Sequence, residues 1–214
     1  MRRGNIIVLA KAPHPGFTKT RLCPPCTPEQ AANLAAAALA DTLDAVLLTD
    51  CQRRVLVFDQ GLSPVAAQAA PWWRNGFEII AQGPGGLAER LNQAFDDVGA
   101  PTFLVAMDTP QVSPALLSAG LDALSNHDAS FGPADDGGYW GIGLARAVGN
   151  VFAGVPMSEA HTGAAQLQRL RDLGLSVATL ATLRDVDTAD DVRVVAALAP
   201  HGKFGAEART TFGA

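Results

Sequence analysis

The chain has 214 residues, of which 48% are hydrophobic and 17% are charged, and its formal net charge is −5. This length suits one large domain, and this composition excludes an intrinsically disordered chain. The negative net charge disfavours non-specific binding to nucleic acid or anionic membranes, which requires a basic surface. No apolar run approaches the roughly 20 residues of a membrane helix. We therefore expect a globular protein without nucleic-acid or membrane partners.

The first ten residues resemble a secretory signal, because basic residues precede the apolar run Ile6–Ala10. The run is too short for a signal, and Lys11 interrupts it before any cleavage site of small residues. We interpret it as a buried first strand. The three cysteines, Cys23, Cys26 and Cys51, are too few for a disulfide framework, so we expect a reducing, cytoplasmic location.

Short apolar runs alternate along the chain with helix-like segments. In chain order the pattern predicts a strand at Asn5–Ala10, a helix at Pro28–Leu48, a strand at Arg54–Asp59, a weak helix at Ser63–Trp73, a strand at Phe77–Ala81, a helix at Leu87–Val98, a strand at Thr102–Met107, a helix at Pro114–Leu124, strands at Asp128–Gly132 and Tyr139–Leu144, a helix at Thr162–Leu173, a strand at Leu175–Leu180 and a helix at Thr188–Ala199. Strands separated by helices imply an α/β fold with a mostly parallel sheet and helices on both faces. Residues 1–199 should form one domain, and residues 200–214 a loosely ordered tail.

The loop after the first strand carries Lys11, Gly16, Lys19 and Arg21. Ligands of parallel sheets bind at the carboxyl ends of the strands, and clustered cations there suit the phosphates of a nucleotide. The loop is not a Walker A motif, because Thr18 and not glycine precedes Lys19. An ordinary solvated turn is the alternative interpretation. Backbone N–H groups before the third predicted helix, at Gly85 and Gly86, offer a weaker anion site.

Three carboxylates are candidates for a divalent metal site. Asp108 ends the fourth predicted strand, and Asp185 and Asp187 point to the same side of an extended segment. Carboxylate oxygens are the ligands that Mg²⁺ prefers, so the sequence predicts Mg²⁺ or Mn²⁺ between these residues. The alternatives are an Asx turn at Asp108 and a helix N-cap at Asp187 or Thr188.

A glycine-rich segment between the fifth and sixth strands combines two carboxylates with a flexible backbone and a tyrosine: Asp135, Asp136, Gly137, Gly138 and Tyr139. The glycines would let the backbone approach a ligand closely, and we expect the segment to bind the acceptor. A plain hairpin turn is the alternative. The Cys23-Pro-Pro-Cys26 segment lacks a second pair of metal ligands, and we interpret it as loop structure.

Several motifs occur together, in order, between Ile6 and about Ala199. They are Ala-Lys-Ala-Pro-x-Pro-Gly-x-x-Lys-Thr-Arg-Leu, Gly-x-Leu-x-Glu-Arg-Leu, x-Asp-Thr-Pro, Gly-Pro-Ala-x-Asp-Gly-Gly-Tyr and Asp-Val-Asp-Thr-x-x-Asp. The chain resembles a bacterial family of GT-A-fold transferases of the nucleotide-diphospho-sugar transferase superfamily, broadly assigned as glycosyltransferases. It is also similar to phospholactate and molybdenum-cofactor guanylyltransferases.

The resemblance implies a role for each matching residue. Lys11, Lys19 and Arg21 would contact nucleotide phosphates, Asp108 would be the metal aspartate, and Asp-Val-Asp at Asp185 would complete the metal site. The family usually has Gly-Ser-Asp-Ser-Pro where this chain has Ala-Met-Asp-Thr-Pro from Ala106.

Three functions remain open at this point. The first is metal-dependent nucleotidyl transfer from a nucleoside triphosphate to a small phosphorylated acceptor, with Lys19, Arg21, Asp108 and Asp136 in catalysis. The second is glycosyl transfer from a nucleotide-sugar, with Asp135 or Asp136 as the base. The third is a nucleotide-binding module without turnover, which would not require separate acidic clusters.

Overall fold

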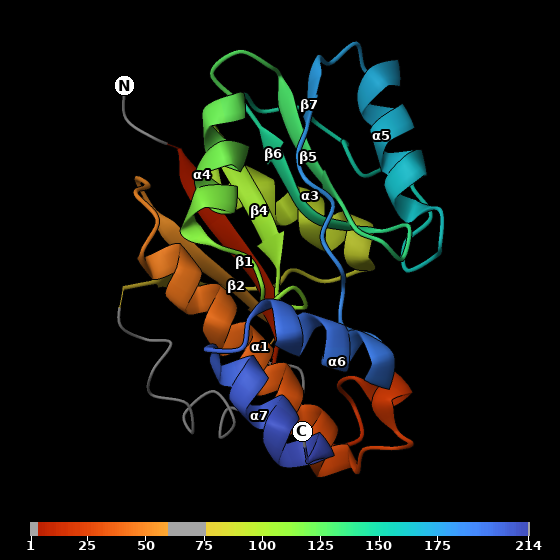
Figure 1. Ribbon diagram of the computed structural model, residues 1–214. Coiled ribbons are helices and arrows are strands. Elements are labelled where there is room, and N and C mark those ends of the chain that lie inside the picture. Colours follow the sequence, from red (N-terminus) through yellow and green to blue (C-terminus); the bar gives the residue numbers. More distant parts are fainter. Residues whose placement is uncertain (1–3, 60–75, 214) are drawn as a thin grey trace.

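The computed structural model describes residues 4–59 and 76–213, and a seven-stranded sheet lies at its centre (Figure 1). The strands stand in the order β3-β2-β1-β4-β6-β5-β7. Their bounds are β1 Asn5–Lys11, β2 Arg54–Asp59, β3 Glu78–Ala81, β4 Thr102–Ala106, β5 Ala129–Pro133, β6 Tyr139–Leu144 and β7 Val177–Thr179. All neighbours pair in parallel except β6, which is antiparallel to β4 and β5. The expected mostly parallel mixed sheet is confirmed.

The helices fill the connections between the strands. Their bounds are α1 Pro28–Leu47, α3 Leu87–Val98, α4 Pro114–Ala123, α5 Thr162–Asp172, α6 Ala189–Leu198 and α7 Lys203–Phe212, with a short 3₁₀ turn at Thr20–Leu22. Local sequence explains where α1 begins. Thr27 and Gln30 form a reciprocal capping box, and Pro28 stands in the first turn, where its missing N–H costs nothing. The expected helix at Ser63–Trp73 lies outside the described residues.

Two hydrophobic clusters cover the two faces of the sheet. Helices α1 and α4 pack on one face, where Leu39, Leu117 and Trp140 are buried. Helices α3 and α5 cover the other face, where Leu91, Leu104 and Leu170 are buried. The helices therefore form a layer on each side of the sheet, as the sequence predicted (Figure 1). In the described part of the chain, no helix is both long and apolar enough to cross a membrane.

The C-terminal segment differs from the expected loose tail. Residues 203–212 form α7, which packs beside α1 and α6, and Phe204 is completely buried there. The start of α7 is capped by Asp41 of α1, whose carboxylate accepts hydrogen bonds from the backbone N–H groups of Lys203 and Phe204, both at 2.8 Å. Because the cap lies more than 160 residues away in sequence, no local signal marks this helix.

Candidate functional site

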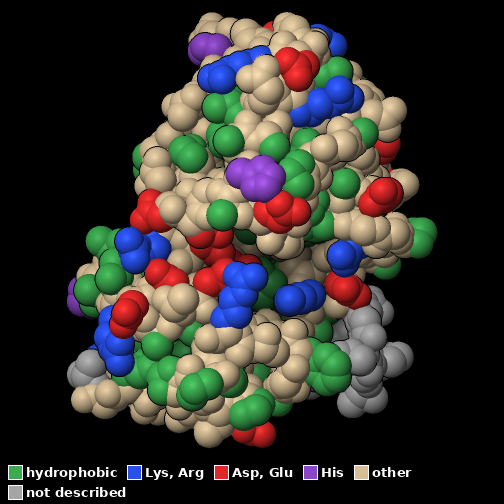
Figure 2. Space-filling view, turned by 90° about the vertical axis from the view of Figure 1, so that its right-hand side faces the viewer, with side chains coloured by type: hydrophobic (Ala, Val, Ile, Leu, Met, Phe, Trp, Pro, Cys, Tyr) green, Lys and Arg blue, Asp and Glu red, His purple; other side chains and the backbone are tan. Residues whose placement is uncertain are grey.

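A cavity of about 750 Å³ lies at the carboxyl edge of the sheet. Loops following β1 and β4, the turn between β5 and β6, the segment before α6 and the segment before α5 all contribute to its walls. Acidic and basic side chains stand side by side around a hollow on this face of the molecule (Figure 2). The site therefore lies where ligands of parallel sheets bind.

The antiparallel strand β6 explains why distant carboxylates meet. Because β6 runs against β4, the turn that begins it lies at the same edge as the end of β4. The segment after β7 follows this edge, since Leu183 bridges to Ala134 and the backbone N–H of Val186 donates to the carbonyl of Asp108 at 3.2 Å. Asp108, Asp136 and Asp185 thus line one cavity although they come from three parts of the chain.

Lys19 lies among these carboxylates and not in solvent. Its Nζ is 2.9 Å from Asp108 Oδ1 and 3.1 Å from Asp187 Oδ1, and only 8% of its side chain is exposed. Burial alone would lower the pKa of Lys19, but Asp108, Asp185 and Asp187 outweigh it and hold that pKa above its usual range. The residue also has a left-handed backbone (φ 51°), which non-glycine residues seldom adopt. Lys19 is therefore a fixed internal cation of the site.

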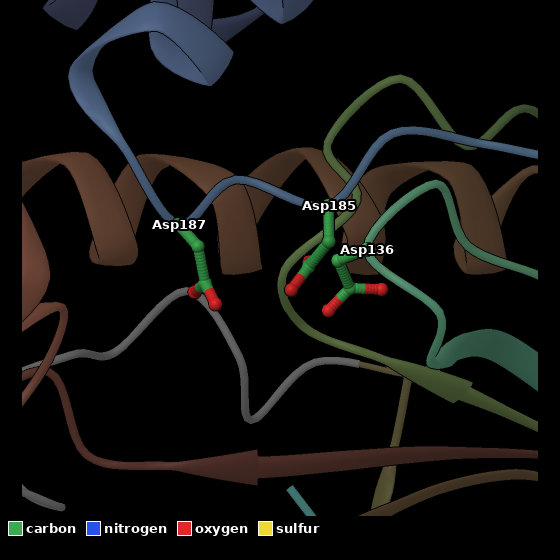
Figure 3. A group of neighbouring side chains, drawn as sticks. All are labelled: Asp136, Asp185 and Asp187. Atoms are coloured by element: carbon green, nitrogen blue, oxygen red, sulfur yellow. The ribbon is translucent and has the colours of Figure 1, made fainter. Parts of the chain in front are cut away.

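Asp136, Asp185 and Asp187 form the group of carboxylates that could hold a metal ion (Figure 3). One oxygen from each lies within 4.8 Å of the others. Burial raises the pKa of Asp185 to about 7, and the like charges of Asp108, Asp187 and Asp136 add to this while Lys19 opposes it. Asp185 and Asp187 come from the segment before α6, and Asp136 comes from the turn between β5 and β6. The group differs from the set expected from the sequence, because Asp136 stands in it where Asp108 was predicted.

Arg184 ties the parts of the acidic group together. Its Nε lies 3.3 Å from Asp135 Oδ2, beside Asp136, and its Nη1 lies 3.1 Å from Asp191 Oδ1. Asp191 in turn accepts hydrogen bonds from the backbone N–H groups of Asp187 and Thr188, at 3.3 and 2.8 Å. The Arg184 guanidinium thus links the turn that carries Asp136 to the start of α6, and this fixes Asp136 relative to Asp187.

The loop after β1 is held by a buried threonine. Thr18 donates to the carbonyl of Ala12 and accepts from the backbone N–H of His14, both at 3.2 Å. Lys11, Lys19 and Arg21 all line the cavity, and Arg21 reaches Asp187 at 2.7 Å while most of its side chain stays exposed. Gly16 does not line the cavity; it has φ 79° and serves the turn.

The glycines of the β5–β6 turn have a structural role that the sequence did not predict. A Cβ atom on Gly137 would overlap the carbonyl oxygen of Ala160, and one on Gly163 would overlap that of Gly138. These glycines therefore allow a close approach between two backbone segments of the protein, where the sequence suggested an approach to a ligand. The segment is also a hairpin turn, as the alternative interpretation had it, and it still brings Asp136, Gly138 and Tyr139 to the cavity.

The remaining predicted residues lie apart from the cavity lining. Asp135 pairs with Arg184, and Gly85 and Gly86 precede α3 without lining the cavity. The three cysteines carry free thiols, and burial raises the pKa of the Cys26 thiol, which does not favour a reactive thiolate. The interpretation of the Cys23–Cys26 segment as loop structure stays a prediction.

Sequence reasoning missed two features of the site. The segment before α5 forms one wall, with Met157, Ser158 and Glu159 lining the cavity. Thr109, directly after Asp108, is 1% exposed and lines the cavity, and its hydroxyl has no hydrogen-bond partner among the described residues. The x-Asp-Thr-Pro motif was the only sequence signal for Thr109, and the wall segment carried no signal.

A family profile and several solved structures match the chain. The profile of the family described as "Uncharacterized protein conserved in bacteria (DUF2064)" matches residues 42–159, more than half of the chain. No protein with a curated description matched the sequence. A protein described as a nucleotide-diphospho-sugar transferase from Desulfovibrio desulfuricans G20 is 27% identical with a TM-score of 0.88, over 98% of this chain and 95% of that chain.

Two further solved structures share the fold at lower identity. A nucleotidyl transferase from Methanothermobacter has 16% identity and a TM-score of 0.62, over 92% of this chain and 98% of that chain. A CMP:2-keto-3-deoxy-manno-octonic acid synthetase complexed with CTP has 13% identity and a TM-score of 0.59, over 92% of this chain and 99% of that chain. The fold expected from the resemblance, that of the nucleotide-diphospho-sugar transferases, is thereby confirmed.

Proposed function

This chain belongs to the DUF2064 family, and from that premise and the geometry of its cavity we propose that it is a metal-dependent transferase with a nucleotide donor. The reaction we propose is nucleotidyl transfer from a nucleoside triphosphate to a small phosphorylated acceptor. The observation that carries the proposal is the meeting of the basic loop after β1 with the group Asp136, Asp185 and Asp187 at one edge of the cavity. The negative phosphates of a nucleotide match the basic loop, and a divalent cation bound to them matches the acidic group.

The cations of the first loop have separate roles in this proposal. Lys11 and Arg21 bind donor phosphates, because both line the cavity and Arg21 keeps 70% of its side chain exposed. Lys19 neutralises the acidic group, and Asp108 positions Lys19. A phosphate nucleophile is already ionised at neutral pH, so positioning and charge neutralisation suffice for the reaction. In agreement with this, the described residues that line the cavity include no histidine to act as a base.

Asp136, Asp185 and Asp187 would hold Mg²⁺ or Mn²⁺. Their oxygens are the ligand type that these ions prefer. Burial, and after it the like charges of the neighbouring carboxylates, raise the pKa of Asp185, and a bound cation would oppose both effects by favouring the ionised carboxylate. A divalent cation there would neutralise charge on the donor phosphates. Shared fold with a nucleotidyl transferase and with a synthetase complexed with CTP supports the choice of a triphosphate donor.

Glycosyl transfer is the second candidate, and one observation favours it. The solved structure that is 27% identical is described as a nucleotide-diphospho-sugar transferase. Such a reaction would use a carboxylate base near an acceptor hydroxyl. Asp136 could supply it, because it lines the cavity and is exposed, whereas Asp135 pairs with Arg184.

Thermal unfolding with a panel of ligands separates these functions, because a ligand stabilises a protein by RT ln(1 + [L]/Kd). The panel contains the nucleoside triphosphates and nucleotide-sugars, each with and without Mg²⁺ or Mn²⁺. Stabilisation by triphosphates, followed by release of pyrophosphate with a phosphorylated acceptor, supports nucleotidyl transfer. Stabilisation by nucleotide-sugars alone favours the second candidate, and binding without turnover favours a binding module.

The metal assignment has a matched control in the same region. Asp136→Asn removes a carboxylate of the group, whereas Asp190→Asn removes the exposed carboxylate that pairs with Arg193. We expect the first variant alone to weaken the metal-dependent stabilisation by nucleotide. Equal loss in both variants, or loss in neither, would contradict the assignment.

A further inference from the structure

One part of the cavity is apolar and has no role in the reaction proposed above. Its side chains line the cavity and also belong to the hydrophobic cluster between the sheet, α3 and α5. They are Leu9, Leu87, Leu91, Leu104, Tyr139 and Met157. The hydrophobic core is therefore open to the cavity at this place, and we call these six residues the apolar floor.

The apolar floor lies directly behind the charged edge. Leu9 of β1 is the register partner of Ala106 of β4, and Lys11 and Asp108 lie two residues further along the chain from each. Leu9 and Lys11 both belong to β1, where two residues span about 7 Å and side chains two apart point to the same face of the sheet, whereas Asp108 lies two residues beyond the end of β4. A ligand that holds a charged group at the edge would therefore place its uncharged part, about 7 Å long, on the apolar floor.

We propose that the apolar floor binds the body of the acceptor, and that the acceptor is a phosphate monoester of a small hydrocarbon or carbocyclic group. This inference rests on the proposed nucleotidyl transfer. With the body on the floor, the phosphate of the acceptor reaches the edge where Lys11, Arg21 and the acidic group hold the donor. The nucleophile and the donor phosphates then meet in one place.

A nucleobase fits the apolar floor less well than such a body. Bases carry several hydrogen-bonding groups on their edges, and burying these against four leucines and a methionine would leave them unpaired. The one oxygen or nitrogen atom that a floor side chain carries is the hydroxyl of Tyr139. Burial raises the pKa of Tyr139, so this hydroxyl stays a neutral donor. It can orient a single oxygen of the acceptor.

Straight-chain alkyl monophosphates from methyl to pentyl phosphate test the inference by calorimetry in the presence of Mg²⁺. Each methylene placed on the floor should tighten binding about fourfold, the effect of burying one such group. Leu87→Asn and Met157→Asn should flatten this dependence and leave the affinity for methyl phosphate unchanged. Leu198→Asn is the matched control, because Leu198 is 65% exposed on α6 and does not line the cavity. Thermal unfolding verifies that each variant is folded, and Met157 lies outside the helices and strands.

Three results would overturn the inference. One is an affinity that does not depend on chain length in the unaltered protein, and another is a dependence that persists in both floor variants. The third is displacement of pentyl phosphate by adenosine, guanosine, cytidine or uridine, which would assign the floor to the base of the nucleotide. Binding of triphosphates is measured separately. If they bind and react while chain length has no effect, the inference alone fails; if chain length matters but no triphosphate binds, the proposed function fails.

Discussion

Replacement of Lys19 by methionine tests the charge balance of the site, because it removes one positive charge and keeps most of the side-chain length. Removing one partner of a buried ion pair costs about 3–5 kcal/mol. Here the partners Asp108 and Asp187 keep 32% and 28% of their side chains exposed, and Arg21 still neutralises Asp187. We therefore expect a loss of about 2–3 kcal/mol in the free energy of unfolding, below the full cost of a buried pair.

The assay is thermal unfolding of both proteins, first in a chelator and then with Mn²⁺. For a chain of this size, 1 kcal/mol corresponds to about 2–4 °C, so Lys19→Met should unfold about 4–12 °C lower without metal. Mn²⁺ should narrow this difference, because a bound cation supplies the positive charge that the variant lacks. The variant should thus gain more from Mn²⁺ than the unaltered protein does.

Lys203→Met is the matched control for this experiment. Lys203 also pairs with a carboxylate, that of Asp44, but the two side chains are 56% and 55% exposed. Exposed pairs contribute about 0–1 kcal/mol, so this variant should unfold close to the unaltered protein and respond to Mn²⁺ as it does. Equal unfolding temperatures for Lys19→Met and the unaltered protein without metal, or equal gains from Mn²⁺, would refute the reasoning.

Four further changes follow from the same contacts. Arg21→Ala should weaken nucleotide binding by about 1.5–3 kcal/mol in calorimetry with little loss of stability, since the side chain is largely exposed; unchanged affinity would contradict its role. Asp136→Asn should stay folded but require more Mn²⁺ for half-maximal nucleotide binding. The double variant Cys23→Ser, Cys26→Ser should keep most of its activity and lose no bound metal; stoichiometric zinc that is present in the unaltered protein and lost in the variant would disprove this. Phe204→Ala should cost about 3–5 kcal/mol in chemical unfolding, because its ring is fully buried; a change below 1 kcal/mol would show that α7 is loosely attached.

Local signals in the sequence determined most of the secondary structure. The predicted bounds of β2, α3 and β6 agree with the structure, and the side chains of Thr27 and Ser113, which directly precede the predicted helices, cap the starts of α1 and α4. Caps, apolar periods and runs of β-branched residues act between neighbours in the chain, so they can be read without the fold. The same holds for the general place of the site, since ligands of parallel sheets bind at the strand ends.

The tertiary structure alone decided which charges meet. The antiparallel course of β6 brings Asp136 to the acidic group, and Lys19 turns inward to pair with Asp108. Asp41 begins α7 from another helix. Each of these contacts joins residues tens to more than a hundred positions apart. Their free energy depends on distance and burial in the folded state, and no local pattern in the sequence records either quantity.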